Sequence, residues 1–154
     1  MPDRKTDIGK LIVLMITAFI DMVGTLMIIP LLPFYAKSFG ANGLVVGTLV
    51  SSFAIAQLLS APMWGRFSDR YGRRPAILLG LLVSVVAYLV FAFAGSLTLL
   101  LVSRFVQGIG AGTVGVLQAY VADAMKEDER AKSLGWLSAS TSLGVVIGPA
   151  FGSL

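Results

Sequence analysis

The segment GRFSDRYGRRP, residues 65–75, decides the fold of this chain. It separates two apolar runs that are each long enough to cross a membrane as a helix, so it predicts a tight hairpin between two spans. Gly65 fits the position just after the first helix, Gly72 a further turn, and Pro75 the first turn of the next helix. Its four arginines indicate that the hairpin stays in water, on one side of the membrane.

Asp69 is the unexpected residue of this hairpin, because an arginine anchor needs no acid. We expect it to bind a helix N-terminus or an arginine such as Arg73, one helical turn later. The alternative is a solvated charge in a basic loop.

The composition is that of a membrane protein. Of the 154 residues, 56% are hydrophobic and 13% charged, and the mean hydropathy is +0.88. Too few polar side chains are present to coat a water-soluble domain, and the chain is too apolar to be disordered. Cysteine and histidine are both absent from the sequence. This excludes disulfide frameworks, Cys/His zinc sites and Ser-His-Asp chemistry.

Five apolar windows of helical length lie along the chain, at about 11–35, 44–64, 75–94, 97–122 and 134–154. Segments of ten residues with alternating polarity, typical of a membrane barrel, are absent from the sequence. The sequence therefore predicts an all-α polytopic membrane protein. Residues 1–10 form an N-terminal tail and residues 11–154 the membrane domain.

The basic residues predict the orientation, because ten of the twelve lie on one side of these spans. Lys37 falls in a loop on the other side, and Arg104 falls within a span. The ten are Arg4, Lys5, Lys10, Arg66, Arg70, Arg73, Arg74, Lys126, Arg130 and Lys132. The positive-inside rule then places the N-terminus in the cytoplasm. Since no polar tail follows the fifth span, we also expect the chain to be a fragment.

Two ionisable side chains lie within spans, Asp21 and Arg104. Each costs about 2.5–3.5 kcal/mol at the centre of an inserted helix, so such residues usually mark function. Counting 1.5 Å per residue puts both near mid-membrane. They are therefore expected to pair directly or through water, either for function or as a structural ion pair.

Small residues form ridges on two of the predicted helices. On the fourth, Gln107, Gly108, Ala111, Gly115 and Gln118 share the face of Arg104, and this face either lines a water-filled path or packs through Gly108 and Gly112. On the fifth, glycines at 144, 148 and 152 accompany Pro149. That ridge predicts close helix packing with a hinge, or alternatively dimerisation.

These motifs together resemble the major facilitator superfamily, whose fold has twelve helices in two halves of six. Residues 65–75 resemble its signature loop between helices two and three, and LVSRFVQGIGAG, residues 101–112, resembles its helix-four motif for proton coupling. GVVIGPAFG, residues 144–152, resembles the helix-five motif of antiporters, and residues 21–33 that of drug exporters. The chain is most similar to drug:proton antiporters, including tetracycline exporters. Those exporters carry an acid before the residue matching Tyr88, where this chain has Ala87. Tetracycline itself is therefore not the expected substrate.

The resemblance implies roles for three groups of residues. A conformational gate would comprise Gly65, Asp69, Arg70, Gly72, Arg73, Arg74 and Asp123. Asp69, Arg73 and Asp123 would be its charge cluster, locking the two halves together. Proton or substrate coupling would use Asp21, Arg104 and Gln107. The antiporter motif would comprise Gly144, Gly148, Pro149 and Gly152.

The expected function is proton-coupled efflux of a hydrophobic small molecule across a bacterial-type inner membrane. The energy source is then the proton gradient rather than a cofactor, and no phosphate-binding Gly-x-x-x-x-Gly-Lys-Ser/Thr stretch occurs. The alternatives are a symporter or uniporter of a sugar or metabolite, and a non-transporting membrane interaction module. An enzyme, a metal site and a nucleic-acid partner are not expected. The expected partners are the substrate, protons, the bilayer and the missing C-terminal helices.

Overall fold

The computed structural model describes the backbone of residues 4–153 and the side chains of residues 8–153. The first residues of the predicted tail, 1–3, and the last residue of the fifth window, 154, lie outside this range. The described helices are α1 (Arg4–Ser38), α2 (Gly43–Tyr71), α3 (Arg73–Ala92), α4 (Leu97–Ala111), α5 (Val114–Ala124) and α6 (Glu127–Gly152). Five membrane-length apolar helices result within the described range, because α4 and α5 together form one span. The all-α membrane fold is thus confirmed.

The helices extend past the predicted windows at the ends of the bundle. Helix α1 begins at Arg4, so residues 4–10 are helical rather than an extended tail. The predicted hairpin is also nearly all helix, since α2 continues to Tyr71 and α3 begins at Arg73. Placing the end of the helix at Gly65 was therefore wrong, because no helix breaker stands between that glycine and Gly72.

Gly72 alone makes the turn between α2 and α3. Its φ of +100° and ψ of 158° lie in a region that side chains with a Cβ rarely adopt. Its N–H donates to the Ser68 carbonyl at 2.9 Å and closes the last turn of α2. A single residue thus reverses the chain, and Pro75 lies in the first turn of α3 as predicted.

The predicted fourth span is broken between α4 and α5, at Gly112 and Thr113. There the N–H of Gly112 donates to the Ile109 carbonyl, three residues back rather than four. Side chains of α2 bind the carbonyls around this break: Trp64 Nε1 donates to Ile109 O at 2.7 Å, and Ser60 Oγ lies 3.3 Å from the same oxygen. Helix α2 therefore supports the break with hydrogen bonds that a bilayer cannot supply.

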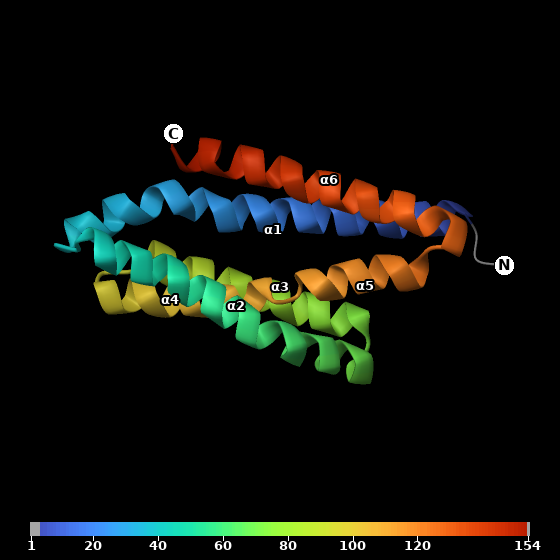
Figure 1. Cartoon of the computed structure of the whole chain (residues 1–154), viewed down its shortest axis with the longest axis horizontal. Coiled ribbons are helices and arrows are strands. Elements are labelled where there is room, and N and C mark those ends of the chain that lie inside the picture. The colour runs from blue at the N-terminus through green and yellow to red at the C-terminus, as the bar shows by residue number, and fades with distance from the viewer. Residues whose placement is uncertain (1–3, 154) are drawn as a thin grey trace.

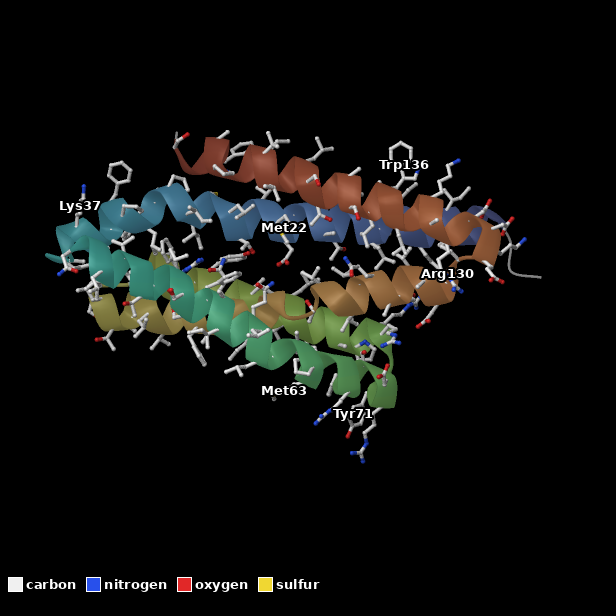
Figure 2. All side chains as sticks on the ribbon, viewed as in Figure 1. Met22, Lys37, Met63, Tyr71, Arg130 and Trp136 are labelled. Carbon is white, nitrogen blue, oxygen red and sulfur yellow. The ribbon has the colours of Figure 1, made fainter. Side chains whose placement is uncertain are left out.

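The helices pack in two groups (Figure 1). Helix α6 lies along α1, while α2, α3 and α4 pack together, and α5 leads back toward α6. Figure 2 shows Lys37 at one end of the bundle and both Tyr71 and Arg130 at the other. The basic segments at 66–74 and 126–132 thus lie at the same end of the bundle. Large apolar side chains such as Leu58 and Val146 are exposed along the bundle. Such a surface suits a lipid environment.

Candidate functional site

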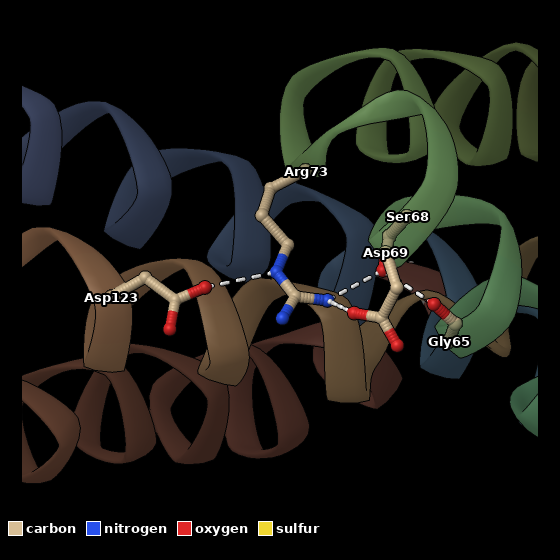
Figure 3. A network of polar contacts seen from close by, with 5 residues as sticks. All are labelled: Gly65, Ser68, Asp69, Arg73 and Asp123. Atoms are coloured by element: carbon tan, nitrogen blue, oxygen red, sulfur yellow. Dashed lines mark hydrogen bonds and ion pairs between the residues drawn. The ribbon is translucent and has the colours of Figure 1, made fainter.

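A charge cluster ties the turn between α2 and α3 to α5 (Figure 3). Arg73 Nη1 lies 2.7 Å from Asp69 Oδ1, and Arg73 Nε lies 3.0 Å from Asp123 Oδ2. The same Nη1 donates to Ser68 Oγ at 2.7 Å. Because Gly72 reverses the chain, Arg73 starts α3 while facing the last turn of α2. The expected partner of Asp69 is thus Arg73, and the structure also brings Asp123 to it.

The ion pairs of this cluster are accessible to water. The side chains of Asp69 and Asp123 are 67% and 61% exposed, and that of Arg73 is 25% exposed. Ion pairs of this kind contribute about 0–1 kcal/mol each. The cluster therefore links three helices through contacts that are easily broken.

The other residues predicted for the gate lie around the cluster rather than in it. Arg74 Nε donates to the Tyr120 hydroxyl of α5 at 2.9 Å, and the Arg70 guanidinium lies 5.4 Å from the centre of the Tyr71 ring. Gly65 takes part through its carbonyl, which accepts from Ser68 Oγ at 2.8 Å. Ser68 and Tyr120 were not predicted. Their contacts depend on the turn and on the approach of α5, and the local sequence indicates neither.

A second group of polar side chains lies inside the bundle. Asp21 is 8% exposed, Arg104 1% and Gln107 2%. Arg104 donates to Gln107 Oε1, and its guanidinium lies 4.6 Å from the centre of the Phe53 ring. The structure thus pairs Arg104 with Gln107 and not directly with Asp21, while pairing with Asp21 through water stays a prediction. Gln107 lies three residues further along the same helix. Side chains at this spacing are neighbours on the helix surface, so Gln107 reaches the guanidinium whatever the position of the other helices.

Two buried N–H groups of this interior have no hydrogen-bond partner among the described residues, Arg104 Nε and Gln107 Nε2. An unpaired buried donor costs about 1–3 kcal/mol, and more when it is charged. Such groups are usually satisfied by water or by a ligand. The interior thus retains capacity to bind an acceptor.

Helix α3 supplies the polar contacts of Asp21. The Ser84 side chain lies near its carboxyl group. Tyr88 Oη lies 3.4 Å from the Asp21 carbonyl and 3.3 Å from Thr25 Oγ1. Tyr88 also lies near enough to Asp21 and Arg104 for both charges to act on its hydroxyl group. Sequence reasoning placed Thr25 on the face of Asp21 but missed Ser84, because serine is common in membrane helices.

A small cavity is lined in part by Asp21. Its volume is about 20 Å³, and Gln118, Ser138 and Thr141 contribute its polar lining. This volume exceeds the roughly 10–15 Å³ that one water molecule needs. Asp21 therefore adjoins both the hydroxyl group of Tyr88 and a cavity of water size.

The glycine ridge of α6 packs on α1 within this chain. A Cβ at Gly144 would lie 2.6 Å from Met22 Cβ, and one at Gly148 would lie 3.0 Å from the Val23 carbonyl. Gly152 faces the Met27 carbonyl even more closely. This close packing is the one that the ridge predicts, and the surface that a dimer would use is already covered by α1.

The small residues of α4 pack in the same way. A Cβ at Gly108 would meet the Phe53 carbonyl and Ala56, and one at Gly112 would meet Ser60 of α2. The packing interpretation thus describes this part of the face. Gly115 has open space beside it, and Gln118 reaches the cavity at Asp21.

The family follows from comparison with known proteins. A profile described as Major Facilitator Superfamily matches residues 14–154. This chain belongs to the Major Facilitator Superfamily. The superfamily is one of membrane transporters and not of enzymes.

Three relatives of this Major Facilitator Superfamily chain carry names of drug resistance. It is 37% identical to Multidrug resistance protein 2 of Bacillus subtilis, over 92% of this chain and 36% of the relative. It is 38% identical to Tetracycline resistance protein, class B, of Escherichia coli, over 90% of this chain and 35% of the relative. It is 33% identical to Quinolone resistance protein NorA of Staphylococcus aureus, over 93% of this chain and 37% of the relative. The chain thus spans about a third of the length of these relatives.

Proposed function

We propose that this chain is the N-terminal part of a proton-coupled exporter of a hydrophobic small molecule. The observation that carries the proposal is the burial of Asp21 at 8% exposure inside an apolar bundle, beside Ser84 and the phenol of Tyr88. It is the only acidic side chain among the buried described residues. Intramembrane carboxyl groups of this kind are typical of proton relays.

In this mechanism a proton and the substrate exchange at Asp21. Protonation removes the negative charge of the carboxyl group, and with it the electrostatic interaction that reaches Tyr88. The phenol and the Arg104–Gln107 pair then rearrange. The unpaired N–H groups of that pair donate hydrogen bonds to a new partner. Release of the proton restores the first arrangement. The cavity beside Asp21 has room for one water molecule, to which the carboxyl group passes its proton.

We assign Asp69, Arg73 and Asp123 to a latch at the proposed cytoplasmic end. Their partial exposure favours a latch that opens and closes, because exposed ion pairs are weak. The helices expected to meet this latch lie in a further half of the transporter. The length of the relatives supports such a half, since this chain covers about a third of each.

The proposed location is the inner membrane of a bacterial cell, with the N-terminus in the cytoplasm. The shared end of the basic segments near Tyr71 and Arg130 supports this orientation through the positive-inside rule. The drug-resistance names of the bacterial relatives support efflux of drug-like molecules. The glycine and proline motif of α6, at residues 144–152, supports antiport.

The test is an Asp21→Asn variant of the complete protein in proteoliposomes loaded with a pH-sensitive dye. Ethidium serves as a hydrophobic cationic substrate. We expect the variant to insert normally and to lose proton movement that depends on ethidium. Asp128→Asn is the matched control, because this acid is exposed in the first turn of α6. It should behave as the unmodified protein.

Two results would contradict the proposal. Undiminished coupling in Asp21→Asn would remove this carboxyl group from the mechanism. Protons that move in the same direction as the substrate would replace antiport by symport.

A further inference from the structure

An apolar groove lies between α2 and α3, with α4 as its floor. Its volume is about 400 Å³. Leu59, Met63 and Phe67 of α2, Leu79 of α3, and Phe105 and Ile109 of α4 contribute most of its lining. Met63 points away from α1 and α6 in Figure 2 and is 69% exposed. The groove therefore opens on a side of the bundle that those two helices leave uncovered.

The length of the groove matches one leaflet of a membrane. Along α2 its lining runs from Ala56 to Phe67. At 1.5 Å per residue this distance is about 16 Å. Half of a hydrocarbon core is about 15 Å. The groove thus extends from the Tyr71 end of the bundle to mid-membrane, which is the reach of one lipid acyl chain.

Two arginines continue the groove at its outer end. Arg66 follows Met63 by three residues, and Arg70 follows Phe67 by three, so both lie on the helical stripe that lines the groove. Neither forms an ion pair with a described carboxylate, in contrast to Arg73. The charge at the mouth of the groove is therefore positive and not neutralised by the described residues.

We propose that this groove is a binding site for an anionic phospholipid of the surrounding membrane. The acyl chain lies along α2 and α3, and the phosphate binds Arg66 and Arg70. Guanidinium groups bind phosphate through paired hydrogen bonds, and basic pockets between membrane helices bind anionic headgroups. The proposal depends only on the membrane setting, so it is independent of the transport mechanism above.

Trp64 provides a reporter for the acyl chain. Its indole lines the groove, and its Nε1 is held 2.7 Å from the Ile109 carbonyl. The complete protein in detergent is titrated with dibrominated phosphatidylglycerol or dibrominated phosphatidylcholine, because bromine quenches tryptophan fluorescence at short range. Subtracting the signal of the Trp64→Phe variant isolates quenching at the groove.

We expect phosphatidylglycerol to half-quench Trp64 at a concentration roughly 25-fold lower than phosphatidylcholine does, about fivefold for each arginine. The double variant Arg66→Gln/Arg70→Gln should lose this preference. Arg66→Lys/Arg70→Lys should keep most of it, and Arg130→Gln, an exposed arginine at the same end of the bundle, should keep all of it.

Three results would overturn the proposal. Equal quenching by the two lipids would indicate ordinary boundary lipid. A preference that persists in the glutamine double variant, with a normal size-exclusion profile, would place the headgroup elsewhere. Absence of quenching by either lipid would indicate that protein covers the groove.

Discussion

Replacing Gly144 by alanine tests the packing of α6 on α1. The new Cβ would lie 2.6 Å from Met22 Cβ and 2.9 Å from the Phe19 carbonyl oxygen. Ordinary carbon contacts are about 3.5–4.0 Å, so α6 must withdraw by about 1 Å or α1 must shift. Overpacking of this kind costs about 1–3 kcal/mol, and the better helix propensity of alanine offsets up to about 1 kcal/mol of that cost. We expect a net loss of about 1–2 kcal/mol in the free energy of unfolding.

Gly135→Ala is the matched control, because this glycine lies on the same helix with open space beside it. It should leave the free energy of unfolding unchanged or raise it by up to about 1 kcal/mol. Steric-trap unfolding of the complete protein in micelles measures both variants, and size-exclusion chromatography reports their oligomeric state. Equal stability of the two variants would refute the close approach of α6 to α1. A change from dimer to monomer in Gly144→Ala alone would assign the ridge to a dimer.

Three further predictions follow from the site. Gly72→Ala should destabilise the protein by about 1–3 kcal/mol, because its φ of +100° suits glycine. Gly65→Ala, inside α2, should be neutral or stabilising. Chemical denaturation compares the two variants, and equal effects would contradict the single-residue turn. Tyr88→Phe should cost about 0.5–1.5 kcal/mol through loss of its hydroxyl contacts, while Tyr35→Phe, on the exposed outer part of α1, serves as the control in the same assay. Arg73→Gln should lower the free energy of unfolding by about 0–2 kcal/mol, up to about 1 for each of its two ion pairs, and the loss should shrink in high salt; a loss independent of salt would show that the cluster acts by packing.

Much of this fold could be predicted from the sequence alone. Five membrane helices follow from apolar length, because a bilayer admits few backbone arrangements, and the family follows from four local motifs. The pairing of Asp69 with Arg73 was expected from their spacing of four residues, although the turn at Gly72, and not a continuous helix, brings them together. The end of α2 was placed seven residues too early, because Gly65 carries the same local signal as Gly72.

Contacts between helices needed the tertiary structure. Only the packing shows that Arg104 pairs with Gln107, which lies on the same helix. Asp21 instead lies beside side chains of α3. The break between α4 and α5 likewise depends on side chains of α2, about 45 residues earlier in the chain. The sequence alone determined that two charged side chains and two ridges of small residues lie within membrane helices, because the apolar windows around them are long enough to span the bilayer. Only the packing of helices decided which contact each one makes, because that depends on distances of a few ångströms between distant segments.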